Sequence, residues 1–151
     1  MSKPPYEILE HTADIGLKAF GSSLPELFVN AASGLVALAK PQDAPQEEMP
    51  MAEKSERLEL RARGADLEEA MVAWLSEILY FMDAEGWVFS EFRVDRVAER
   101  PGESAVNGEA MGERCDPLAR SRAVPVKAVT YHQISVREIG GGWEAVVYFD
   151  I

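Results

Sequence analysis

The sequence predicts an α+β fold in which two amphipathic helices pack on about seven mainly antiparallel strands. Two segments carry apolar residues at helical spacing, and most of the other segments alternate apolar and polar residues as strands do. Because the strands do not alternate one by one with helices, the pattern differs from that of a βαβ nucleotide-binding fold. The 151 residues are enough for a full core, so we expect a single domain over residues 1–151.

The N-terminal third begins with a strand and continues with a helix. Residues Tyr6–Phe20 alternate loosely and predict a strand that is interrupted at 11–14, where a bulge re-aims the side chains. Ser23–Glu26 matches a capping box, and apolar residues then recur at helical spacing until Lys40 and the proline after it end the helix. Residues 41–53 are rich in Pro, Gln and Glu without an apolar period, which predicts a mobile linker within the domain.

A second strand and a second helix follow. Residues Glu56–Arg63 alternate charged residues with Leu and Ala, as expected for a strand with one solvated face. Asp66 is a predicted N-cap, and residues 67–82 form a helix with a wide apolar stripe. Trp74 and Tyr80 in this helix could line an aromatic cofactor, but packing in the core is the favoured interpretation.

The C-terminal half of the chain is predicted to consist of strands. Phe92 and Val94 alternate, whereas Val97 is out of step, which indicates a bulge. The three glycines at 140–142 predict a hairpin between the last two strands. The further segments predicted here are a turn at 100–103, a loop at 112–123, and strands at 104–111, 124–131, 134–139 and 143–149.

The charge of the chain narrows the choice of partners. Fifteen Lys and Arg against 26 Asp and Glu give a formal net charge of −11. Because nucleic-acid affinity rests largely on cationic side chains, we expect tRNA to be bound at most indirectly. The three arginines at 114, 120 and 122 are interpreted as a solvated loop. Cations, or a protein with a basic face, are the expected partners.

The sequence also indicates the compartment. Cys115 is the one cysteine, so the chain forms no intramolecular disulfide, as is typical of a reducing cytoplasm. The N-terminal residues lack the apolar core of a signal peptide, and no apolar run approaches the roughly 20 residues of a membrane helix. We therefore expect a cytoplasmic protein without a membrane partner.

Several catalytic motifs are absent from the sequence. There is no G-x-G-x-x-G motif and no Walker loop with its lysine. A zinc site would have to be built from Cys115, His11 and His132, which is few ligands for such a site. A catalytic Cys–His pair made of Cys115 with His11 or His132 is also disfavoured, because no local motif surrounds Cys115.

Three short segments carry a more specific signal. They are His11-Thr12-Ala13-Asp14-Ile15-Gly16, then Lys127-Ala128-Val129-Thr130-Tyr131-His132, and finally Phe149-Asp150-Ile151 at the end of the chain. In their order and amino-acid sequence these segments resemble the motifs of the archease family, which are H-T-A-D-[IV], K-A-[VI]-T-Y and a terminal [FI]-D-[IV]. The resemblance extends from about Tyr6 to Ile151 and therefore covers nearly the whole chain.

The resemblance implies a function and a set of residues. It implies a metal-binding accessory protein, not an enzyme, that activates an RtcB-type RNA ligase in tRNA splicing and RNA repair by promoting guanylylation and turnover. The implied metal ligands are Asp14, Asp150 and the terminal carboxylate of Ile151. Lys127 matches the lysine that the family associates with activity, and His11 matches the first motif, so both are candidate contacts to the partner or its nucleotide. No role is carried over to the histidine at 132.

The chemistry of these ligands agrees with that implication. Carboxylate oxygens are hard donors, which suits Ca²⁺ first and Mg²⁺ or Mn²⁺ as alternatives. Anionic groups that converge repel each other, by about 4 kcal/mol per pair at 4 Å and an effective dielectric constant of about 20. A divalent cation removes this repulsion, so the cluster is expected to be stable mainly when a cation is bound.

Two other functions remain open at this point. The same carboxylates could serve a stand-alone metal-dependent phosphohydrolase or nuclease, with Lys127 stabilising phosphate charge. The chain could also be a chaperone-like interaction module that uses the apolar helix faces or the linker at 41–53.

Overall fold

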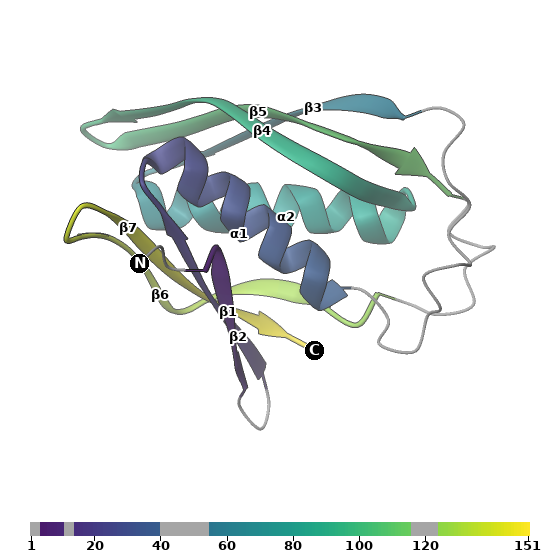
Figure 1. Ribbon diagram of the computed structural model, residues 1–151, viewed down its shortest axis with the longest axis horizontal. Helices are drawn as coiled ribbons and strands as arrows, with labels where there is room; N and C mark the ends of the chain where they lie inside the picture. The colour runs from purple at the N-terminus through teal and green to yellow at the C-terminus, as the bar shows by residue number, and fades with distance from the viewer. Residues whose placement is uncertain (1–3, 11–13, 40–54, 116–123) are drawn as a thin grey trace.

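Two helices are held between two antiparallel β-sheets in the computed structural model (Figure 1). The structure describes residues 4–10, 14–39, 55–115 and 124–151. The predicted linker at 41–53, His11, Arg120 and Arg122 lie outside these residues. The helices are α1 (Leu24–Ala39) and α2 (Leu67–Ala84).

All strand pairs are antiparallel. The four-stranded sheet has the order β1-β2-β7-β6 and consists of β1 (Tyr6–Glu10), β2 (Asp14–Gly21), β6 (Ala128–Ile139) and β7 (Gly142–Asp150). The three-stranded sheet has the order β3-β5-β4 and consists of β3 (Glu56–Gly64), β4 (Trp87–Arg100) and β5 (Glu103–Arg114). The predicted class, two helices and seven mainly antiparallel strands, is confirmed.

The wide apolar stripes of the helices follow from their position between the sheets. Helix α1 contacts β2 of one sheet and β4 of the other, and α2 contacts β3 and β6 in the same way. Each helix is therefore covered from two sides, which requires apolar residues on more than one narrow stripe. The predicted N-cap of α2 is present, because the Asp66 carboxylate accepts a hydrogen bond from the Glu69 backbone N at 2.9 Å.

Trp74 occupies the centre of this core and is fully buried. Its Nε1 donates a hydrogen bond to the Phe28 carbonyl at 3.0 Å, and the two rings meet edge to face. Packing of Trp74 in the core is thus confirmed. The same prediction is wrong for Tyr80, which is 55% exposed because it lies on the side of α2 that neither sheet covers.

Two predicted boundaries differ from the structure. Tyr6–Phe20 is not one interrupted strand but the two strands β1 and β2, which pair antiparallel from Tyr6 opposite Ala19 to Glu10 opposite Ile15. The chain therefore reverses at the predicted interruption. Apolar alternation cannot distinguish these cases, because a bulge and a chain reversal both permit the change from apolar even positions (Tyr6, Ile8) to apolar odd positions (Ile15, Leu17).

Near the C-terminus, the two strands predicted at 124–131 and 134–139 form a single strand in the structure. Residues 128–139 form the single strand β6, whose pairing with β7 shifts register between Thr130 and Ser135, and Gln133 has a positive φ of 52°. The residues 124–127 precede the strand instead of belonging to it. Strand β5 also continues to Arg114, into the region predicted as a loop. The irregularity predicted near Val97 is present as a register shift between Val94 and Arg96.

None of the helices in the described residues combines the length and the apolar character needed to cross a membrane.

The burial of the helix layer predicts which substitutions destabilise the fold. Leu75→Ala should lower the free energy of unfolding by about 2–5 kcal/mol, because Leu75 is fully buried and its truncation leaves a cavity. Tyr80→Ala on the same helix is the matched control and should change it by less than about 0.5 kcal/mol. Urea unfolding followed by circular dichroism measures both, and equal losses would contradict the two-sided covering of α2.

Candidate functional site

The first residue of β2 lies directly opposite the last residue of β7. Asp14 is the Cα partner of Asp150 in the antiparallel register, although the two residues are near opposite ends of the sequence. Directly opposed Cα atoms in such a pair are about 4.5–5.5 Å apart, and the side chains share one face of the sheet. The fold therefore brings together two carboxylates that the sequence separates.

These carboxylates are on the outer face of the four-stranded sheet. Their strand neighbours Leu17 and Phe149 are fully buried in the core formed with the helices. Because side chains alternate between faces, Asp14 and Asp150 face away from the helices. Asp14 is half-buried and Asp150 is exposed, so solvent and ions can reach the pair.

Two more of the predicted site residues lie beside this pair. Ile151, whose terminal carboxylate is the predicted third ligand, directly follows Asp150, and its side chain is 46% exposed. The backbone N of Lys127 donates a hydrogen bond to the Asp150 carbonyl at 2.8 Å, and Lys127 is exposed. Asp14 of the first motif, Lys127 of the second and Asp150 of the third therefore lie side by side at one end of the sheet.

No cationic side chain among the described residues forms an ion pair with the carboxylates of Asp14 and Asp150. Like charges directly opposite each other in a sheet are destabilising. This arrangement leaves a local excess of negative charge on hard oxygen donors, which is the chemistry that a Ca²⁺ or Mg²⁺ ion requires.

The donor set fits a cation that shares its shell with water. Among the residues that the structure describes, no group of three or more His, Cys, Asp or Glu side chains could hold a metal ion. Two side chains and a terminal carboxylate supply fewer than the six to eight oxygens of a Ca²⁺ shell, so water would complete it. The soft or nitrogen ligands considered from sequence lie apart, because Cys115 follows β5 in one sheet and His132 lies on β6 in the other.

The pair next to the carboxylates was not assigned a role from sequence. Gly16 is the Cα partner of Tyr148, and a Cβ on Gly16 would lie 2.7 Å from Cε1 of the Tyr148 ring. The ring therefore occupies the space of a side chain at Gly16, which explains a glycine in this strand. The His132 ring meets the Tyr148 ring edge to face, with centroids 6.1 Å apart. Side-chain alternation along β2 puts Gly16 on the face of Asp14, whereas its neighbour Tyr148 is known only because β7 lies beside β2.

The strand that carries Lys127 and His132 is irregular at this place. Thr130 pairs with Tyr148 and its Oγ1 donates to the Tyr148 carbonyl at 3.0 Å, whereas the next paired residue of β6 is Ser135. The intervening residues leave the regular ladder, and Tyr131 among them is 62% exposed. Bulges of this kind are frequent next to functional sites because they re-aim side chains.

Comparisons with known proteins converge on one family. The model of the Archease protein family (MTH1598/TM1083) matches residues 6–151. A protein archease of Methanosarcina barkeri is 36% identical over 146 residues, which are 97% of this chain and 95% of that protein. A protein archease of Pyrococcus furiosus is 33% identical over 147 residues, which are 97% of this chain and 98% of that protein.

Solved structures show the same architecture. The solution structure of Methanobacterium thermoautotrophicum protein 1598 has a TM-score of 0.73 and 29% identity, and the match covers 97% of this chain and 99% of that chain. A crystal structure at 2.0 Å from Thermotoga maritima, described as an archease and possible chaperone, has a TM-score of 0.53. At 23% identity over 100% of this chain and 98% of that chain, the second likeness shows the fold alone.

Because Asp14 and Asp150 are directly opposed, removing the charge of one of them should stabilise the fold. In the presence of a chelator, Asp14→Asn should raise the free energy of unfolding by about 0.2–1 kcal/mol, because it removes a directly opposed like-charge pair. Glu7→Gln, on β1 of the same sheet opposite Lys18, is the control and should give no gain. Denaturant titration measures the difference. An equal gain in both variants would assign the effect to net charge instead of the pair.

Proposed function

This chain belongs to the archease protein family, and from that premise we propose that it is a metal-binding accessory protein that activates an RtcB-type RNA ligase. On this proposal it promotes guanylylation and turnover of the ligase and has no substrate of its own. The observation that supports the proposal best is the pairing of Asp14 with Asp150. It places side chains from two of the three family motifs at one end of a sheet, next to the last residue of the chain.

The proposed site has three anionic ligands. Asp14 and Asp150 would contribute side-chain carboxylates, and Ile151 would contribute the carboxylate of the chain end. These are oxygen donors of the kind that Ca²⁺ takes most readily, with Mg²⁺ and Mn²⁺ as alternatives. A divalent ion at this position would supply positive charge to phosphate oxygens near the ligase active site. The site lies at one end of the two central strands of the sheet, and the exposed Asp150 leaves it open to solvent for such a contact.

The rest of the proposed interface follows from charge and exposure. A chain with a formal net charge of −11 is suited to docking on a basic surface of the ligase. Lys127 is exposed and joined through its backbone to Asp150, so it is positioned to contact the ligase or its nucleotide. This placement supports the role that the second motif implies for Lys127.

A chaperone-like function is the second candidate, because a Thermotoga maritima protein of the same fold is described as a possible chaperone. The helix faces that such a function would use are covered by both sheets in the described residues. Exposed apolar surface is what a holdase needs for unfolded clients. The covered helix faces therefore favour the activator over the chaperone, and binding of many unfolded clients would favour the chaperone.

The proposed site predicts that cation binding stabilises the fold. At Ca²⁺ concentrations of about 100 times its dissociation constant, wild-type protein should gain about 2.7 kcal/mol in free energy of unfolding. Asp150→Asn should lose most of this gain, and so should a protein whose C-terminus is amidated or extended by one residue. Asp95→Asn, which alters an exposed carboxylate on β4, should keep it. Calcium titration with thermal unfolding measures all four, and full stabilisation of the amidated protein would remove Ile151 from the ligand set.

The activator function predicts a defined loss in a reconstituted ligase. Asp14→Ala and Asp150→Ala should fold but fail to stimulate guanylylation of the ligase with GTP, and Lys127→Ala should weaken the stimulation. Glu138→Ala, an exposed residue at the far end of β6, is the control and should retain it. Incorporation of labelled GMP into the ligase in the absence of RNA measures the effect.

Full stimulation by both aspartate variants would refute the metal mechanism. Hydrolysis of RNA or nucleotides by the isolated protein with Mg²⁺ or Mn²⁺, lost in Asp14→Ala, would instead establish the phosphohydrolase.

A further inference from the structure

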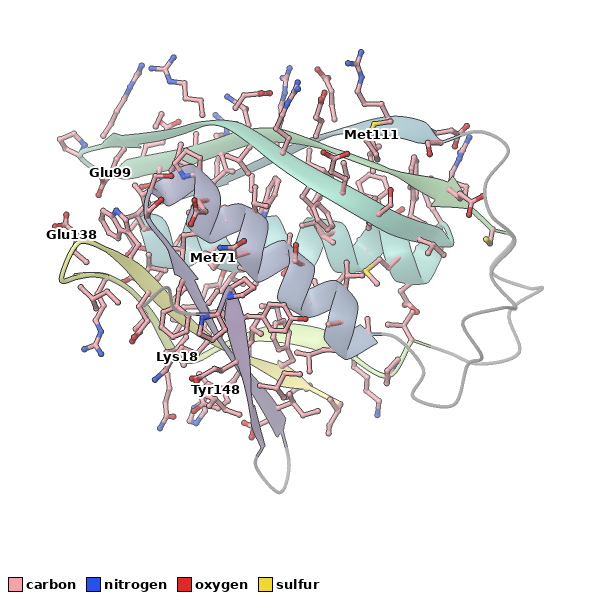
Figure 2. All side chains as sticks on the ribbon, in the orientation of Figure 1. Lys18, Met71, Glu99, Met111, Glu138 and Tyr148 are labelled. Atoms are coloured by element: carbon pink, nitrogen blue, oxygen red, sulfur yellow. The ribbon has the colours of Figure 1, made fainter. Side chains whose placement is uncertain are left out.

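Tyr148 lies on the outer face of the four-stranded sheet, and yet it is buried, with 7% of its surface exposed. Its strand neighbour Phe149 points into the core, so alternation directs Tyr148 to the same face as Asp150. Figure 2 labels Tyr148 and Lys18 at this sheet, below the helix layer that contains Met71. The outer face of such a sheet is commonly solvated, so the burial of this ring requires neighbours on the same face.

On one side the ring of Tyr148 covers Gly16 of β2. A Cβ at Gly16 would lie 2.7 Å from Cε1 and 3.1 Å from Cδ1 of the ring, and 3.0 Å from the Cβ of Leu9 on β1. One edge of the ring therefore occupies the space above Gly16, and Leu9 closes that space from the β1 side. Aromatic contacts of this kind across neighbouring strands fix the register of the pair.

On the other side Tyr148 is held by β6. The Thr130 hydroxyl donates a hydrogen bond to the Tyr148 carbonyl at 3.0 Å and accepts one from the backbone N of His132 at 3.3 Å. The His132 ring then meets the Tyr148 ring edge to face, with centroids 6.1 Å apart. The irregular part of β6 therefore packs against the ring whose other edge covers Gly16.

The row formed by Tyr148 and Gly16 is next to the row formed by Asp150 and Asp14. Such rows on one face of a sheet are about 6.6–6.8 Å apart. Asp14 is the first residue of β2 and Asp150 is the last residue of β7, so their row ends the ladder between these strands. Strand ends open more readily than strand centres, and the repulsion between opposed carboxylates favours opening here. On the outer face, the contact between Tyr148 and Gly16 is the one next to this end.

We propose that Tyr148 is the positioning residue of the candidate metal site. Its ring on Gly16 holds the ends of β2 and β7 together, so that the carboxylates of Asp14 and Asp150 stay within reach of one cation before the cation binds. Ligands that are already in place lose less conformational freedom on binding, which raises affinity. The ring acts through the two strands and does not touch the ion. This inference rests on the metal site of the proposed function and adds to it a residue outside the three family motifs.

The calcium affinity of the folded protein separates positioning from stability, because a residue that only stabilises the fold leaves this affinity unchanged. Isothermal titration calorimetry of the full chain with Ca²⁺ measures the dissociation constant. Tyr148→Leu should weaken Ca²⁺ binding about tenfold, as is typical when a residue that supports metal ligands is removed. Tyr148→Phe preserves the ring and the contact with Gly16, so it should restore the affinity to within about twofold of wild type.

Val146→Ala is the matched control. Val146 is half-buried on the same face of β7 as Tyr148, and it lies one row farther from the carboxylates, opposite Lys18. Its truncation also removes apolar contacts from this face, but it leaves the row of Tyr148 and Gly16 in place. The Ca²⁺ dissociation constant should therefore stay within about twofold of wild type, because distant sites act independently.

The contact between the ring and Gly16 gives a second test. Gly16→Ala should weaken Ca²⁺ binding about tenfold, because the added methyl group collides with the Tyr148 ring. In the Tyr148→Leu background the same substitution should cost less than about threefold, since leucine has no atom at the place of Cε1. Thermal unfolding shows which variants are folded at the temperature of the titration. If Tyr148→Leu does not fold, the comparison of Gly16→Ala with Val146→Ala decides the question.

The possible results separate this inference from the proposed function. Wild-type affinity in Tyr148→Leu or in Gly16→Ala, equal losses in these variants and Val146→Ala, or fully additive losses in the double variant would overturn the positioning role alone. A wild-type protein that binds none of Ca²⁺, Mn²⁺ and Mg²⁺ would refute the metal site, and the positioning role with it. Tight binding by wild type, lost in Tyr148→Leu and regained in Tyr148→Phe, would establish both.

Discussion

The pairing of β2 with β7 is the constraint on which the rest of the molecule depends. It places the beginning and the end of the chain in adjacent strands of the same sheet, with Asp14 opposite Asp150. The inner face of the same pair supplies Leu17 and Phe149 to the core against the helices. One ladder thus serves both purposes, because alternation sends apolar side chains inward and carboxylates outward. Core stability and the geometry of the candidate site are therefore coupled.

The helices and the N-cap at Asp66 were predictable because their signals are local, arising from spacing and capping within a few residues. The wide stripe on α2 also indicated burial, but only the structure shows that two sheets cover it. The wrong predictions concern strand boundaries that are determined by pairing between distant segments. The reversal after Glu10 and the continuity of β6 through Gln133 both depend on pairing with other strands. The alternation of apolar and polar residues within one segment contains no information about that pairing.

The candidate site also has a part that the sequence predicts and a part that only the structure shows. Family motifs identified Asp14, Lys127, Asp150 and Ile151 from the sequence, and the register shows how a sheet brings their positions together. The pairing of Gly16 with Tyr148 could not be predicted, because it depends on which strand lies beside β2. Composition was equally uninformative about position. The net charge of −11 gives no position for any charged side chain, and only cross-strand register places Arg61 and Arg96 on either side of Asn107.

The central claim is that both ends of the chain hold one hard cation, and paramagnetic NMR tests it most directly. Mn²⁺ is titrated into ¹⁵N-labelled full-length protein, and broadening of each backbone amide is followed. If the account is correct, the amides of Asp14, Ala128 and Asp150 lose intensity together, with one midpoint, and added Ca²⁺ restores all three. Broadening confined to one end, separate midpoints for the two ends, or broadening centred on a different part of the molecule would contradict it.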